Sequence, residues 1–134
     1  MTSNYSETYL RKVLKDVKTI AIVGASSNPN RDSHKVMKFL IDCGYQIFPV
    51  NPKEKNILGR KCYSALNLIQ ENIDMVDVFR ATEFIFDITK KAISIDAKIL
   101  WTQEGIIDEK AAALARNAGL IVIMNECPKK VLEA

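Results

Sequence analysis

The chain has 134 residues, of which 48% are hydrophobic and 26% charged, and this predicts one domain spanning residues 1–134 with a core large enough to fold alone. The small net charge of +3 and the dispersed lysines argue against nucleic acid as a partner. No apolar run approaches the ~20 residues of a membrane span, and residues 1–18 contain no secretory signal. The three cysteines are dispersed and form no C-x-x-C pair, which favours a cytoplasmic protein without a zinc site.

Short apolar strands alternate with amphipathic segments along the chain. We expect residues 1–5 to fray and the apolar spacing predicts helices over residues 6–17, 33–43, 65–70, 83–95 and 108–117, with Ser6 and Ser33 as N-caps. Strands are predicted over residues 19–23, 46–50, 73–79, 98–101 and 120–124, and a polar loop over residues 53–61. This alternation implies a Rossmann-like, doubly wound, five-stranded parallel sheet with helices on both faces and strand order 3-2-1-4-5.

The first strand and the helix after it frame a candidate anion site. Residues 19–23 are apolar throughout, and Gly24 then permits a tight turn. A strand, a glycine turn and a helix start favour phosphate, because free N–H groups and the positive end of the helix dipole face the loop. In the G-x-G-x-x-G fingerprint, however, glycines would stand at Ser26 and Pro29. The alternative is an ordinary strand–helix connection in which the serines only cap.

The end of the second strand bears on which nucleotide would bind. Ligands of such sheets lie at the carboxyl ends of the strands, at the switch point, which is expected here beside the first strand. An NAD site usually has Asp or Glu after the second strand, whereas this chain has Asn51 and Lys53, whose donors suit a ribose phosphate. Glu54 could take part of the acid's role, and the alternative for Lys53 is a solvated loop lysine.

Four motifs, in this order, resemble the small single-domain CoA-binding proteins, whose fold is similar to the CoA-binding N-terminal domain of the succinyl-CoA synthetase α subunit. They are Val23-Gly24-Ala25-Ser26 with Pro29 and Ser33, then Gly44-Tyr45 with Pro49-Val50-Asn51-Pro52-Lys53, then Asp77-Val78-Phe79-Arg80, and Trp101-Thr102-Gln103-Glu104-Gly105-Ile106. The resemblance covers about residues 15–130. It implies a Rossmann-like domain that binds coenzyme A at the strand ends.

The resemblance also implies a role for each matching residue. The pyrophosphate would be held by Gly24, Ala25, Ser26 and Ser33. The adenosine end and its 3′-phosphate would be contacted by Val50, Asn51, Pro52 and Lys53. The pantetheine side would be lined by Phe79, Arg80, Gln103 and Gly105.

The sequence contains no evident catalytic constellation. His34 is the only histidine and follows a helix start, Cys127 is expected to be a small buried residue, and Trp101 is expected to pack. Asp74 and Asp77 are three positions apart on one strand, so their side chains are expected to point in opposite directions.

We therefore expect a non-catalytic protein that binds CoA or acyl-CoA as a carrier, sensor or regulatory subunit, without a membrane or nucleic-acid partner. One alternative is an NADP-type nucleotide-binding protein or reductase. Another is a subunit of an acyl-CoA-handling complex, with catalysis on a partner protein. A protein partner or a homo-oligomer is compatible with all three hypotheses.

Overall fold

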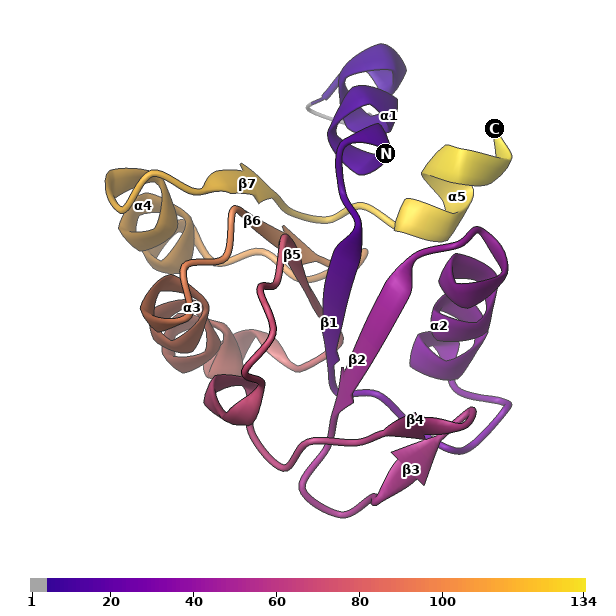
Figure 1. The fold of residues 1–134 in the computed structure, drawn as a ribbon. Coiled ribbons are helices and arrows are strands. Elements are labelled where there is room, and N and C mark those ends of the chain that lie inside the picture. Colours follow the sequence, from indigo (N-terminus) through magenta and orange to yellow (C-terminus); the bar gives the residue numbers. More distant parts are fainter. Residues whose placement is uncertain (1–4) are drawn as a thin grey trace.

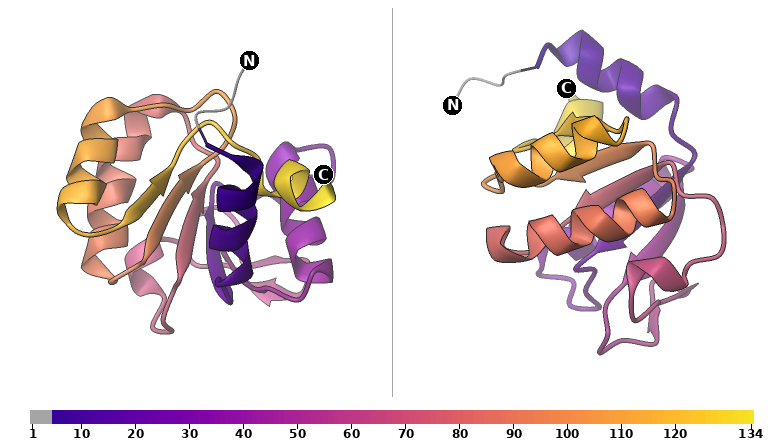
Figure 2. Two further views of the ribbon diagram at one scale, coloured as in Figure 1. Left: turned by 90° about the horizontal axis from the view of Figure 1, so that it is seen from above. Right: turned by 90° about the vertical axis from the view of Figure 1, so that its left-hand side faces the viewer.

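A five-stranded parallel sheet with helices on both faces forms the fold, as seen in a computed structural model that describes residues 5–134 (Figure 1). The strands are β1 (Thr19–Val23), β2 (Gln46–Val50), β5 (Met75–Val78), β6 (Ile99–Thr102) and β7 (Ile121–Ile123). One face carries α1 (Glu7–Lys15), α2 (Asp32–Asp42) and α5 (Pro128–Glu133), and the other carries α3 (Ile85–Ser94) and α4 (Glu109–Asn117) (Figure 2). The predicted fold class is confirmed.

The strand order differs from the prediction. The sheet runs β2-β1-β5-β6-β7, so β5 pairs with β1, and the predicted order 3-2-1-4-5, in which it would pair with β2, is wrong. The physical reason lies in Pro49 of β2, which has no N–H to donate to a further strand and therefore suits an edge. The switch point accordingly lies between β1 and β5, beside the first strand as expected.

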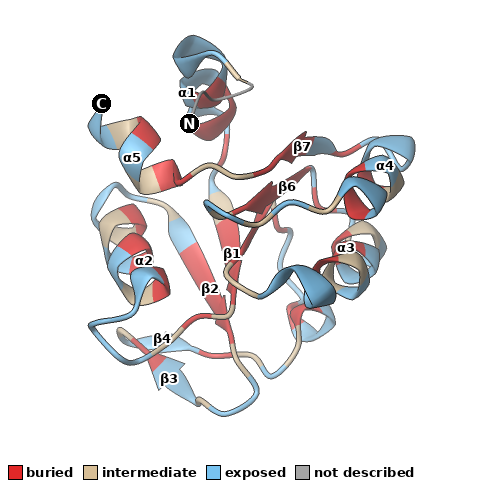
Figure 3. Cartoon of the chain, turned by 180° about the vertical axis from the view of Figure 1, so that it is seen from behind, coloured by how far each residue is buried: buried red, intermediate tan, exposed pale blue. Residues whose placement is uncertain are grey.

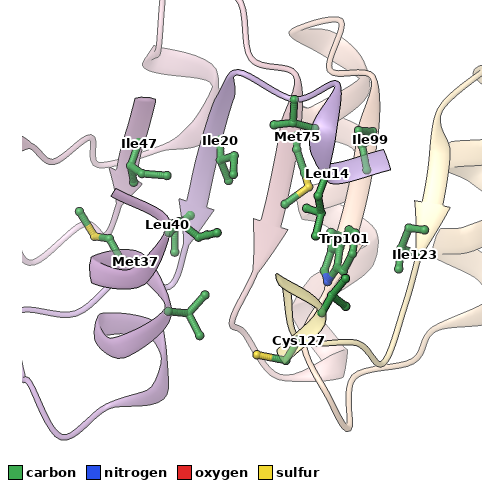
Figure 4. Packing of buried hydrophobic residues seen from close by; sticks show 14 of the residues in the cluster. Leu14, Ile20, Met37, Leu40, Ile47, Met75, Ile99, Trp101, Ile123 and Cys127 are labelled. Atoms are coloured by element: carbon green, nitrogen blue, oxygen red, sulfur yellow. The ribbon is translucent and has the colours of Figure 1, made fainter. Parts of the chain in front are cut away.

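Two apolar layers hold the helices on the sheet. The first layer joins α1, α2 and α5 to alternate residues of the strands, and the second joins α3 and α4 to the opposite face. Buried residues accordingly concentrate in the strands and on the inner faces of the helices (Figure 3). Trp101 lies fully buried in the first layer and donates its Nε1 hydrogen to the Glu126 carbonyl at 2.9 Å (Figure 4). Its predicted packing role is confirmed, and Cys127 is buried in the same layer.

The predicted N-cap of α1 is confirmed, whereas the predicted N-cap of α2 and part of the expected fraying are wrong. Ser6 caps α1 by accepting a hydrogen bond from the Tyr9 amide at 3.1 Å, and Gly44, with φ +99°, follows the end of α2. Ser33, however, is not an N-cap, because Arg31 already has the extended cap backbone and α2 begins at Asp32. The fraying expected for residues 1–5 is wrong at Tyr5, whose hydroxyl accepts a hydrogen bond from the Met124 amide, while residues 1–4 lie outside the described range.

The connection between β2 and β5 contains structure that the sequence analysis missed. A small hairpin of β3 (Asn56–Ile57) and β4 (Arg60–Lys61) replaces the predicted polar loop, and its turn places Leu58 and Gly59 at positive φ. The helix predicted over residues 65–70 is only a 3₁₀ turn, η1 (Leu66–Leu68), and a second 3₁₀ turn, η2 (Thr82–Phe84), leads into α3. No helix within residues 5–134 has the length and apolar character needed to cross a bilayer.

The two aspartates of the third predicted strand have very different surroundings. Asp74 accepts hydrogen bonds from the amides of Lys18 and Thr19 at the surface. Asp77 is fully buried in β5, and neither carboxyl oxygen has a hydrogen-bond partner within the described chain. Burial alone raises the pKa of Asp77 well above its ordinary value, so this carboxyl is expected to be protonated in the folded protein.

This buried acid predicts how stability depends on pH. Between the unfolded pKa of about 3.9 and the higher folded pKa, the unfolded chain releases a proton that the folded chain keeps, so the free energy of unfolding should fall as pH rises, by up to ~1.4 kcal/mol per pH unit. Asp77→Asn cannot ionise and should show a flatter profile in urea unfolding series above about pH 4. Asp42→Asn, at an exposed site, is the control. Parallel profiles for Asp77→Asn and the wild type would show that Asp77 does not carry this linkage.

Candidate functional site

An open cleft of about 1080 Å³ lies at the carboxyl ends of the central strands, at the switch point of the sheet. Its walls come from the segments after β1, β2, β5 and β6 and from the beginnings of α2 and α3. Every residue predicted for the site lines this cleft except Gly105. The amide of Gly105 instead donates to the Oδ1 of Asn125 at 2.6 Å, so this glycine secures the loop after β6. No cluster of potential metal ligands occurs among the described residues.

Gly24 is the point at which three strand ends meet. Its φ is +92°, and a Cβ there would lie only 2.5 Å from the carbonyl oxygen of Phe79, at the end of β5. Its amide donates to the carbonyl of Val50, at the end of β2, at 3.0 Å. The glycine therefore serves both the turn and the close approach of β5.

Three backbone amides around the turn remain available to a ligand. The amide of Ala25 donates to Val50, but those of Ser26, Asp32 and Ser33 have no hydrogen-bond partner within residues 5–134. The last two belong to the first turn of α2, an eleven-residue helix whose positive dipole end faces the cleft. Free amides at such a position are suited to an anion.

Hydrogen bonds made by the side chains of Asn51 and Glu54 join the loops after β1 and β2. The side chain of Asn51 donates to the carbonyl of Ala25 at 2.8 Å and accepts from the amide of Lys53 at 2.9 Å. Glu54 accepts the amide hydrogen of Ser27 at 2.7 Å, and this hydrogen bonding lowers the pKa of Glu54. Glu54 does not line the cleft. The structure therefore assigns both residues a part in shaping the two loops.

The charges lining the cleft are unevenly compensated. Two of its three carboxylates are paired with lysines outside it, Asp87 with Lys90 at 3.9 Å and Glu104 with Lys130 at 2.8 Å, whereas the third, Asp32, forms no ion pair with the described residues. The lining cations, by contrast, form no ion pair with any residue of 5–134; these are Arg31, Lys53, Arg80 and Lys91. Four unpaired cations against one unpaired carboxylate leave a site that attracts negative charge.

Sequence reasoning missed one wall of the cleft. This wall is mainly apolar and consists of Ala65, Leu66, Ala81, Phe84, Ile88 and Ile106. Phe84 ends η2, and Ile88 lies four positions further on in the first turn of α3; this spacing was the available signal. The cleft is also lined by Gln103, whose Oε1 is buried without a hydrogen-bond partner among the described residues. The cleft therefore offers apolar surface as well as positive charge.

The parallel sheet and the cleft define a Rossmann-like α/β protein with an open, cation-lined cleft at the switch point. Residues 18–133 match the model of a family described as a CoA binding domain, and the chain belongs to that family. It is 39% identical to the protein YneT of Bacillus subtilis over 126 residues, which cover 94% of this chain and 93% of YneT.

The chain is also similar to part of a longer enzyme and to a protein whose structure has been solved. It is 34% identical over 71 residues to an ADP-forming acetate–CoA ligase of Methanocaldococcus jannaschii, a match that covers 53% of this chain but 10% of the ligase. A solved hypothetical protein from Pyrococcus horikoshii has 38% identity and a TM-score of 0.93, covering 97% of this chain and 92% of that one. The chain is thus a CoA-binding-domain protein related to one part of these ligases.

Proposed function

We propose that this protein binds coenzyme A or an acyl-CoA and acts as a non-catalytic carrier, sensor or regulatory subunit. The observation that carries the proposal is the set of unpaired cations and free amides around Gly24 in one open cleft. Coenzyme A bears a pyrophosphate and a 3′-phosphate, so it presents negative charge at two separate points. Charge-assisted hydrogen bonds from a lysine, an arginine or a helix start suit such groups.

The proposed contacts follow the ligand from one end to the other. The pyrophosphate lies against the turn and the first turn of α2, formed by Gly24, Ala25, Ser26 and Ser33. The adenosine end and its 3′-phosphate lie against Val50, Asn51, Pro52 and Lys53, where Lys53 supplies the cation and Asn51 shapes the loop. The pantetheine arm passes Phe79 and Gln103, which both line the cleft.

An NADP-type ligand is the second candidate, because Lys53 could equally pair with a phosphate on the ribose 2′ position. Free ribose hydroxyls, as in NAD, have less support: Glu54, the acid nearest the end of β2, is held by Ser27 and lies outside the cleft. The partial match to a ligase supports the third candidate, a subunit whose catalytic partner is another protein. Co-purification of a partner would test that candidate.

Thermal unfolding with a panel of ligands tests the proposal. Coenzyme A at ~100 times its dissociation constant should add roughly 2.7 kcal/mol to the free energy of unfolding and raise the melting temperature by several degrees. Acetyl-CoA should act similarly, dephospho-CoA less, and NAD least. The proposal fails if NADP raises the melting temperature and coenzyme A does not.

A further inference from the structure

Arg80 lies where the sheet changes direction, immediately after β5, and it lines the cleft. Its side-chain stem is close to the glycine turn, since a Cβ on Gly24 would be 3.2 Å from the Cδ of Arg80. The resemblance to CoA-binding proteins assigned Arg80 to the pantetheine side. Its contact with Gly24 instead places the arginine beside the turn proposed to hold the pyrophosphate.

The guanidinium of Arg80 is supported by an aromatic ring. Its Cζ lies 4.2 Å from the centroid of the Phe84 ring, which is itself 42% exposed. A cation–π contact of this kind restricts the guanidinium without a conventional hydrogen bond. Phe84 thus limits the orientation of Arg80, and the donors of Arg80 form no hydrogen bond to a protein acceptor within the described residues.

The donors of Arg80 have no partner in the protein. Neither a hydrogen bond nor an ion pair joins its guanidinium to any described residue, although three carboxylates line the same cleft, those of Asp32, Asp87 and Glu104. Asp87 and Glu104 are paired with Lys90 and Lys130 instead. An oriented guanidinium with free donors beside a phosphate loop is arranged for bidentate binding of an oxyanion.

We propose that Arg80 binds the pyrophosphate of the ligand from the β5 side of the Gly24 turn, and that Phe84 is the positioning residue that orients it. This inference rests on the proposed function. It specifies a ligand class, because a pyrophosphate offers two phosphate groups to the turn and the arginine together. The arginine contacts a group that coenzyme A and dephospho-CoA share, whereas Lys53 contacts the group in which they differ.

Isothermal titration of variants with both ligands tests this inference. Arg80→Gln should weaken coenzyme A and dephospho-CoA by the same factor, ~10–100-fold. Arg80→Lys should recover part of the loss, because an ammonium keeps the charge without the planar fork. Arg60→Gln, at an exposed arginine outside the cleft, is the matched control and should bind as the wild type does.

A double-mutant cycle tests the positioning role of Phe84. Phe84→Leu alone should weaken both ligands by about threefold to fivefold, the effect of losing an exposed cation–π contact. In the Arg80→Gln background the same change should cause no further loss, because Phe84 acts through Arg80. An undiminished loss in that background would show that Phe84 contacts the ligand by itself, and the positioning role would be wrong.

The outcomes separate this inference from the proposed function. Wild-type affinity in Arg80→Gln, or a loss confined to coenzyme A, would overturn the pyrophosphate contact while CoA binding stands. Failure of the wild type to bind either ligand would overturn the proposed function itself. Melting temperatures of the unliganded variants report on folding, and Arg80→Lys with Phe84→Leu carries the test if Arg80→Gln does not fold.

Discussion

Replacing Gly24 with alanine is expected to destabilise the folded chain by about 2–5 kcal/mol. Part of this follows from φ, which at +92° is a conformation that side chains with a Cβ rarely adopt. The rest follows from contact, because the new Cβ would lie 2.5 Å from the carbonyl oxygen of Phe79 and β5 would have to move. Urea unfolding would measure the change.

Gly119→Ala is a closely matched control for this experiment. Gly119 has φ +90°, almost the value at Gly24, but an added Cβ would meet nothing within 4 Å. The difference between the two variants therefore isolates the close approach of β5 to the turn. Equal destabilisation of the two variants would contradict the argument that Gly24 is required for that approach.

Lys53→Ala is expected to weaken coenzyme A by about 1–3 kcal/mol, the range for a lost hydrogen bond to a charged group. The low end is more appropriate because Lys53 is exposed and water reaches its ammonium group. Dephospho-CoA should lose much less affinity, because it lacks the 3′-phosphate that Lys53 contacts. Titration calorimetry with both ligands measures this difference.

Two further variants serve as controls for Lys53. Lys55→Ala removes an equally exposed charge from the same loop but outside the cleft, so it should leave both affinities unchanged. Ser26→Ala should weaken both ligands alike, because the pyrophosphate is common to them. If Lys53→Ala reduces the two affinities equally, Lys53 does not recognise the 3′-phosphate.

The sequence was most informative where local pattern and tertiary structure agree. The bounds of β1 and β2 were predicted to the residue. Each strand is a short, mostly buried run, and Gly24 follows β1 as Asn51 follows β2. The strand order was not predicted correctly, because strand pairing is decided between segments that are distant in the sequence. The one local signal for it, Pro49 within β2, was not used.

The cleft was predicted from its loops but not from its helical wall. Residues such as Ser26 and Lys53 follow strand ends and carry recognisable chemistry, so their convergence could be foreseen. Phe84 and Ile88 resemble ordinary core positions in sequence, and only the packing of α3 shows that they face the cleft. The role of Asn51 was also hidden, because its bond to Ala25 depends on how two loops meet.

Both lateral borders of the sheet are partly protected against growth by strand addition. At β2, Pro49 presents no N–H, and its carbonyl already accepts the amide hydrogen of Tyr63. At β7, the hydroxyl of Tyr5 accepts from the Met124 amide and donates to the Val122 carbonyl, two groups that a docking strand would otherwise use. Borders protected in this way resist edge-to-edge aggregation. We therefore expect a second copy or a partner protein to bind through side chains on helices and loops and not by adding a strand.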